Sequence, residues 1–229
     1  MENVIKHNPE LWLKNLPEEA NYWYGVISGF PNKQKQAESF RKKASGELPF
    51  PTVLRPFLIK NSETSILDVG AGPHTVIGLA GLKEKIKIVA IDPLADVYNE
   101  ILSAFNIVPA IMTQQGIAEE LDLDNLGQFD LVYSRNAIDH SYNPIKAIEN
   151  MLLATKKTGT LFIEGAVNEG KRQNYHGLHQ WNFLPDEENG DMLLWNKEVK
   201  ISLRKHFQNK CSIKARRNGK TFYLIIKHC

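Results

Sequence analysis

Two glycines spaced one residue apart follow a short apolar run that contains an acid. The stretch Ser65–Thr75 reads SILDVGAGPHT, so Gly70 and Gly72 come shortly after Asp68. Glycines at such a position let the backbone turn tightly and approach a ligand closely. The pattern predicts a loop that holds a nucleotide-type cofactor.

The loop lacks the endings of two common phosphate-binding motifs. A dinucleotide loop has a third glycine where this chain has Thr75, and the Gly-Lys-Ser/Thr ending of a P-loop is absent. A second acid, Asp92, ends the next apolar run, at the place where a ribose lies in folds of this kind. We therefore expect a ribose-bearing cofactor and no pyrophosphate.

Histidines gather in two later segments. Ser134–His140 reads SRNAIDH, and Asn168–Phe183 contains HGLHQW. In a parallel sheet both segments would lie beyond the carboxyl ends of strands, where ligands bind. Imidazole can act as a base near neutral pH or as a hydrogen-bonding group. The candidate catalytic residues are His140, His176 and His179. The candidate substrate-binding residues are Tyr175, His176, His179, Trp181 and Asp139.

A metal site is the competing interpretation of these side chains. Asp139, His140, His176 and His179 are of the types that bind zinc or iron. Two histidines three residues apart share one face only if their segment is helical, and Gly177 between them favours a loop. We therefore expect no metal.

Apolar runs and amphipathic stretches alternate from Ser65 onward, which is typical of a doubly wound parallel sheet. The expected strands are Ser65–Val69, Ile86–Ile91, Val108–Met112, Leu131–Ser134, Leu161–Glu164, Cys211–Arg217 and Thr221–His228. The expected helices are Pro17–Gly29, Lys33–Ala44, Thr75–Leu82, Leu94–Phe105, Pro144–Thr155 and Glu198–Phe207. A turn is expected at Lys156–Thr160.

The two ends of the chain differ from its middle. Residues 1–60 are rich in Trp, Tyr, Pro and Lys, and they predict a helical lid or cap. Near the C-terminus, Asn218-Gly219 separates two β-rich runs, a strong hairpin signal. The predicted fold is α/β, with a mostly parallel seven-stranded sheet, a C-terminal antiparallel hairpin and an N-terminal helical lid. The chain thus divides into the helical lid or cap, residues 1–60, and a main domain, residues 61–229.

Four motifs together resemble the class I S-adenosylmethionine (SAM)-dependent methyltransferases, and their small-molecule branch most closely. The motifs are ILDVGAG, AIDP, GIAEEL and FDLVYSRNAIDH. The resemblance covers roughly residues 60–165 well and the C-terminal hairpin in outline. It implies that SAM is the cofactor and that a small molecule accepts the methyl group on oxygen or nitrogen.

The resemblance also implies a role for each motif. The first loop would hold the methionine part of SAM, the acid after the second strand the ribose, and the GIAEEL loop the adenine. The implied cofactor-binding residues are Asp68, Gly70, Ala71, Gly72, Asp92, Pro93, Ile117, Ala118, Glu119, Ser134 and Asn136. Two residues depart from the family pattern, His74 where a glycine is frequent and Ile117 where an aspartate is frequent.

Charge and cysteine content limit the remaining function classes. The 28 basic and 26 acidic residues give a net charge of +2, so there is no electrostatic signature of nucleic-acid binding. Two cysteines, Cys211 and Cys229, do not form a disulfide framework. No apolar run approaches the roughly 20 residues of a membrane span. We expect a cytoplasmic protein without a nucleic-acid or membrane partner, and a homodimer is left open.

Two other functions stay open at this level. One is methylation of RNA or protein, against which the near-neutral charge weighs. The other is a SAM-binding regulatory protein without activity, an alternative suggested by His74 in the glycine loop.

Overall fold

The structure is a computed structural model that describes residues 8–208 and 210–229. Its centre is a seven-stranded sheet in the order β3-β2-β1-β4-β5-β10-β9. The strands of this sheet are β1 (Thr64–Val69), β2 (Ile86–Asp92), β3 (Thr113–Gln115), β4 (Phe129–Arg135), β5 (Thr155–Ala166), β9 (Cys211–Asn218) and β10 (Thr221–His228).

The first five strands are parallel and the last two form an antiparallel hairpin. β1 pairs in parallel with both β2 and β4, so the glycine loop leaves the middle of the sheet. β10 runs antiparallel to β5 and to β9, and Gly219 and Lys220 form the turn after Asn218. The expected fold class, with seven strands and a C-terminal hairpin, is confirmed.

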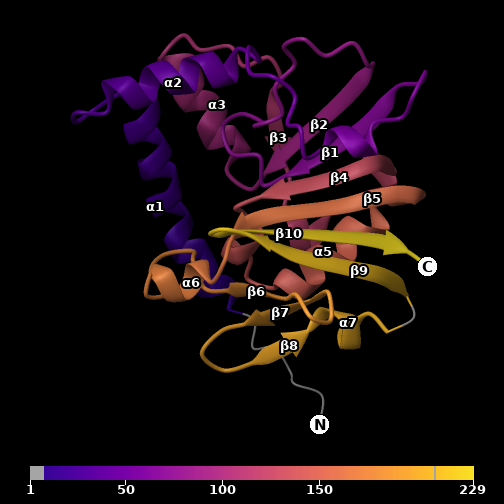
Figure 1. Cartoon of the computed structure of the whole chain (residues 1–229). Coiled ribbons are helices and arrows are strands. Elements are labelled where there is room, and N and C mark those ends of the chain that lie inside the picture. The colour runs from indigo at the N-terminus through magenta and orange to yellow at the C-terminus, as the bar shows by residue number, and fades with distance from the viewer. Residues whose placement is uncertain (1–7, 209) are drawn as a thin grey trace.

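Helices connect the strands and cover the sheet (Figure 1). The helices are α1 (Pro9–Ser28), α2 (Gln34–Ala44), α3 (Ala95–Ala104), α4 (Leu123–Leu126), α5 (Pro144–Leu153), α6 (Glu169–Arg172) and α7 (Leu203–His206). Short 3₁₀ turns are η1 (Arg55–Phe57), η2 (Ala118–Glu120) and η3 (Ile138–His140). Within residues 8–208 and 210–229, no helix combines the length and apolar character needed to cross a membrane.

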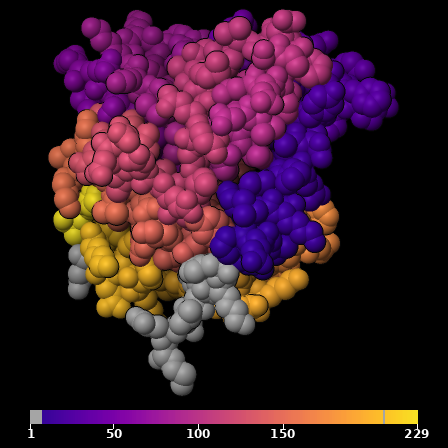
Figure 2. Space-filling view, turned by 180° about the vertical axis from the view of Figure 1, so that it is seen from behind, coloured from indigo at the N-terminus to yellow at the C-terminus, as the bar shows by residue number. Residues whose placement is uncertain are grey.

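α1 and α2 form the N-terminal part of the fold, and its indigo atoms lie at the surface in the view from behind (Figure 2). α1 begins where the Asn8 side chain accepts a hydrogen bond from the Leu11 N–H, and it ends at Gly29 in a left-handed conformation. Buried residues of α1, α2 and α3 form one apolar cluster that includes Ile27, Phe40 and Leu102. In Figure 1 the indigo α1 runs along one side of the molecule, past the end of the sheet at which β4 and β5 finish. Closure of these helices as a lid stays a prediction.

A second sheet, which the sequence analysis did not anticipate, lies below the hairpin in Figure 1. It contains β6 (Asn182–Asp186), β7 (Asp191–Trp195) and β8 (Lys200–Ser202), all antiparallel. Its buried side chains join the same apolar core as α5 and β5. The expected helix over Glu198–Phe207 is therefore wrong in its first half, because Lys200–Ser202 pairs with β7 and only Leu203–His206 is helical.

The expected helix over Thr75–Leu82 is also wrong. The N–H groups of Leu79 and Ala80 donate to the carbonyls of Gly46 and Leu48, so this segment pairs with another part of the chain. The contact is close, since a Cβ on Gly78 would lie 1.9 Å from the Leu48 carbonyl oxygen. Tertiary pairing has replaced the local helical pattern.

Two more boundaries differ from the sequence prediction. The expected turn at Lys156–Thr160 lies inside β5, at an irregularity in its pairing with β4. Phe129 pairs with Thr155 and Leu131 with Thr160, so β5 contains the extra residues as a bulge. The third strand, expected at Val108–Met112, is instead the short strand β3 that directly follows it.

Candidate functional site

The glycine loop follows β1 and borders a cavity of ≈ 620 Å³. Gly70 and Gly72 have φ values of 71° and 67°, in the left-handed region that glycine tolerates. The loop lies close to the segment after β4, since a Cβ on Gly70 would come within 2.3 Å of the Ala137 Cβ. Any side chain at position 70 would therefore clash with Ala137. The glycines form a cradle of the kind that a cofactor needs.

Thr75 holds the end of the loop where a dinucleotide motif would have its third glycine. Its hydroxyl donates to the Asp68 carboxylate at 2.5 Å and accepts from the Ile77 N–H at 3.1 Å. Asp68 is buried beneath the loop and is not among the residues that border the cavity. Asp68 thus holds the loop through Thr75, on the side away from the cavity.

The Asp68 carboxyl group has an unusual acidity. Burial, with a contribution from the neighbouring Asp92 and Glu164 carboxylates, raises its pKa to about 7 against the opposing effects of the Thr75 hydrogen bond and Arg135. The carboxyl group is thus partly protonated near neutral pH.

His74, the departure from the family pattern, is buried and borders the cavity. Its Nδ1 lies 2.7 Å from the Thr75 carbonyl oxygen, and its ring meets the Phe40 ring edge-on at 4.9 Å between centroids. Burial lowers the pKa of His74. The neutral imidazole therefore links the loop to α2.

Asp92 at the end of β2 borders the cavity and is buried. One carboxylate oxygen accepts from the Gly72 N–H and the other from the Leu94 N–H, each at 2.9 Å. Burial raises the Asp92 pKa to about 6, against these two hydrogen bonds. Each carboxylate oxygen can accept a second hydrogen bond, so both ribose hydroxyls of a nucleoside still find an acceptor here. Pro93 borders the same part of the cavity.

The segment after β3 forms the next wall of the cavity, with Ile117, Ala118 and Glu119. Glu119 is buried, one of its oxygens accepts from the Asn143 N–H at 3.1 Å, and burial raises its pKa. Its acceptor groups suit the exocyclic amine of an adenine.

The end of β4 supplies two further expected residues. Asn136 borders the cavity with a φ of 50°, and its N–H donates to the Glu164 carbonyl. Ser134 is fully buried and does not border the cavity; within the described ranges its hydroxyl has no hydrogen-bond partner. The structure thus brings Gly70, Ala71, Gly72, Asp92, Pro93, Ile117, Ala118, Glu119 and Asn136 to one cavity.

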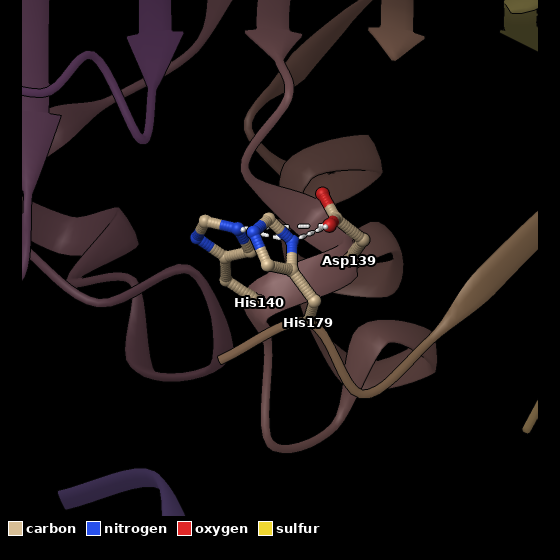
Figure 3. Close-up of side chains that lie close together, drawn as sticks. All are labelled: Asp139, His140 and His179. Carbon is tan, nitrogen blue, oxygen red and sulfur yellow. Dashed lines mark hydrogen bonds and ion pairs between the residues drawn. The ribbon is translucent and has the colours of Figure 1, made fainter. Parts of the chain in front are cut away.

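Asp139, His140 and His179 form a compact cluster, which Figure 3 shows with the two imidazole rings beside the carboxylate. His179 Nδ1 lies 2.9 Å from Asp139 Oδ2 and 2.9 Å from His140 Nε2. His140 Nε2 lies 3.6 Å from Asp139 Oδ2. η3 supplies Asp139 and His140, and the loop between α6 and β6 supplies His179.

The cluster perturbs its own acidities. Burial would raise the Asp139 pKa, but the neighbouring His140 and His179 outweigh burial and lower it. Burial would lower the His179 pKa, but the hydrogen bond and charge of Asp139 outweigh burial and raise it.

The other candidate acceptor residues lie in different places. His140 borders both the main cavity and a neighbouring cavity of ≈ 320 Å³, whereas Tyr175 and Trp181 border only the second one. The His176 side chain is 75% exposed, with its Nδ1 3.5 Å from Glu18 Oε1. His176 is thus separate from the Asp139–His140–His179 cluster.

Several cavity residues were not predicted. Trp23 of α1 lies over the glycine loop, since a Cβ on Gly72 would be 3.6 Å from the Trp23 ring. Trp12, Leu178 and Arg135 also border the cavity. The aromatic residues in the first helix were a visible signal, but only the fold shows which of them face the loop.

The sheet order, the glycine loop and the acid after β2 define a protein of the class I methyltransferase fold. The chain belongs to the family of methyltransferase domains, whose model matches residues 39–196. The cofactor of the class I methyltransferases is SAM, and the chain is a transferase of this family.

Solved structures share the fold at low sequence identity. A putative SAM-dependent methyltransferase from Methanococcus maripaludis aligns with a TM-score of 0.52 at 17% identity, over 92% of each chain. The DhpI–SAM–HEP complex aligns with a TM-score of 0.50 at 10% identity, over 94% of this chain and 97% of that one. The CurJ carbon methyltransferase has a TM-score of 0.51 at 15% identity, over 75% of this chain and 50% of that one. No curated protein matches the sequence.

Proposed function

We propose that this protein transfers a methyl group from SAM to an oxygen or nitrogen of a small-molecule acceptor. The observation that carries the proposal is one cavity with two kinds of lining residue. Gly70, Gly72 and Asp92 border it, and so does His140 of the Asp139–His140–His179 cluster. A cofactor and an acceptor can therefore meet in the same space.

The cradle fits SAM in shape and in the types of its donors and acceptors. Gly70 and Gly72 have no side chain, so the loop presents its backbone to the cavity. Asp92 and Glu119 supply carboxylate acceptors for ribose hydroxyls and an adenine amine. SAM has no pyrophosphate, so Thr75 in place of a third glycine is no obstacle. One similar structure, DhpI, is described as a complex with SAM.

When bound, SAM supplies an electrophilic methyl group on its sulfonium. The protein must align the acceptor atom with that methyl group and exclude water. Trp12 and Trp23 of α1 border the cavity and cover part of it. His140 is the histidine of the three candidates that borders the main cavity, so it is the one placed to contact an acceptor.

A small acceptor is favoured over RNA or protein for two reasons. The cavity volume of ≈ 620 Å³ lies within the range of small-molecule sites. The net charge of +2 offers no electrostatic footprint for nucleic acid. The alternative of an inactive cofactor-binding protein was suggested by His74. The His74 ring contacts Phe40 and the Thr75 carbonyl, so His74 has a structural role in the loop.

The test has two stages. Calorimetry with SAM and S-adenosylhomocysteine first measures cofactor binding, for which we expect one site per chain. Isotope-labelled SAM then reports methyl transfer to a panel of small hydroxylated and aminated compounds, with RNA and denatured protein as competing acceptors. Cofactor binding with transfer to RNA or protein alone would overturn the small-molecule assignment. Binding without transfer to any acceptor would favour the regulatory alternative.

A further inference from the structure

Three atoms with lone pairs converge in the Asp139–His140–His179 cluster. Asp139 Oδ2, His140 Nε2 and His179 Nδ1 lie 2.9–3.6 Å from one another. With both imidazoles neutral, a proton on His179 Nδ1 must be shared between two acceptors. A proton on His140 Nε2 instead leaves the His179 lone pair facing the carboxylate. A cation bound to all three atoms satisfies each of them at once.

The spacing matches a metal coordination sphere. Bonds of ~2.0–2.2 Å to histidine nitrogen and carboxylate oxygen place neighbouring ligand atoms ~2.9 Å apart in an octahedron and ~3.3 Å apart in a tetrahedron. The observed separations of 2.9, 2.9 and 3.6 Å bracket these values. Two imidazoles and one carboxylate on one side of an ion form the ligand set of many transition-metal centres.

The backbone holds the two contributing segments together. The Gln180 N–H donates to the Asp139 carbonyl oxygen at 3.3 Å, directly beside His179. The Gln180 side chain also donates to the carbonyls of Tyr175 and Gly177, which ties the loop to itself. Asn15 of α1 donates to the same Gly177 carbonyl at 2.9 Å. The position of His179 is thus fixed by contacts on three sides.

The loop also contains unfavourable backbone conformations. Asn174 and Tyr175 have φ values of 53° and 57°, and both are residues other than glycine. Such conformations are unfavourable for residues other than glycine and persist where surrounding structure fixes them, often at functional sites. The strained loop ends in the residues that present His179 to η3.

We propose that Asp139, His140 and His179 bind a divalent transition-metal ion at the acceptor end of the cavity. Two nitrogen ligands favour manganese, iron, cobalt or zinc over magnesium and calcium, which prefer oxygen. Of the four residues that the sequence analysis named as metal-binding types, only His176 lies outside this ligand set. His140 borders both cavities, so an ion on its Nε2 lies next to the acceptor space.

The metal site extends the proposed function. It rests on that function only in assuming that the neighbouring cavity holds a methyl acceptor. An ion at this place selects acceptors whose reacting oxygen or nitrogen can coordinate a metal. Ion binding itself requires no methyl transfer, so the two proposals fail separately.

The experiment titrates chelator-stripped full-length protein with Zn²⁺, Mn²⁺ and Mg²⁺ by calorimetry, and with Co²⁺ by visible absorption. We expect one site per chain for the transition metals and much weaker binding of Mg²⁺. His179→Ala and the isosteric Asp139→Asn should each weaken Zn²⁺ binding by more than ~100-fold, the upper end of the loss that outer-shell changes cause. His206→Ala is the matched control, because His206 also pairs with a carboxylate, Glu149, at 3.0 Å.

S-adenosylhomocysteine binding by the same variants reports whether they are folded. Stoichiometric Zn²⁺ binding that is lost in both cluster variants, with S-adenosylhomocysteine affinity retained, supports the metal site. Absence of stoichiometric binding to the wild-type chain overturns it and leaves the cluster as a hydrogen-bonded Asp–His–His group. Equal binding by wild type and Asp139→Asn overturns it as well, since the ion would then lie elsewhere.

Discussion

Replacing Gly70 by alanine tests whether the loop after β1 holds the cofactor. The new Cβ would lie 2.3 Å from the Ala137 Cβ, whereas ordinary contacts begin at 3.4 Å, so the two segments must separate by 1.1 Å (3.4 − 2.3). The left-handed φ of 71° adds roughly 1–2 kcal/mol of strain. This separation would displace the loop backbone that borders the cavity.

Gly81→Ala separates the clash from the strain. Gly81 has a nearly equal φ of 68°, but a Cβ there meets nothing within 4 Å. Both variants should lose roughly 1–2 kcal/mol of unfolding free energy to strain, and Gly70→Ala should lose ~1–3 kcal/mol more to overpacking. Denaturant titration measures this difference.

Calorimetry with S-adenosylhomocysteine then measures cofactor binding. We expect Gly70→Ala to weaken binding at least ~10-fold, which corresponds to about 1.4 kcal/mol, and Gly81→Ala to bind as the wild type does. Wild-type affinity in a folded Gly70→Ala variant would show that the cofactor lies elsewhere. Equal losses in both variants would trace the effect to backbone strain and refute the argument from the clash.

Four further predictions follow from the site. Asp92→Ala should weaken SAM binding by about 1.5–3 kcal/mol, and unchanged affinity in calorimetry would refute the ribose assignment. The variant should also have a lower unfolding free energy, because two buried N–H groups lose their acceptor. Because the folded-state pKa of Asp68 is raised to about 7, the contribution of Asp68 to the unfolding free energy should be fully present below about pH 4 and be lost as the pH rises through 7. Asp68→Asn removes the titrating group, so the thermal stability of this variant should depend less on pH than that of the wild type. NAD at a concentration comparable to that of SAM should not displace SAM; displacement in a competition titration would contradict the class of cofactor. His140→Ala removes the candidate imidazole that borders the main cavity and should lower turnover by about 10²–10⁴ with little change in SAM affinity; normal turnover with every acceptor would contradict a role for His140 at the acceptor.

Local patterns were sufficient for the elements that depend on local interactions. The apolar run before Gly70 predicted β1, and Asn218-Gly219 predicted the C-terminal hairpin. The sheet of β6, β7 and β8 had the same signal, since Asn189-Gly190 separates its first two strands, but the sequence analysis did not use it. A turn signal far from a recognised motif was thus missed.

Long-range contacts explain the remaining differences. The segment 75–82 has helical spacing, yet pairing with residues 46–48 decides its structure. The histidine cluster joins η3 to a loop about 40 residues later. The sequence named Asp139, His140, His176 and His179 together, and only the fold shows that His176 lies apart from the other three.

A crystal structure of the full-length protein with S-adenosylhomocysteine tests the central claim most directly. We expect the adenosine next to Asp92 and Glu119, and the amino-acid part against the backbone of Gly70 and Gly72. A ligand bound elsewhere, or an empty cavity at a saturating concentration of S-adenosylhomocysteine, would contradict the account.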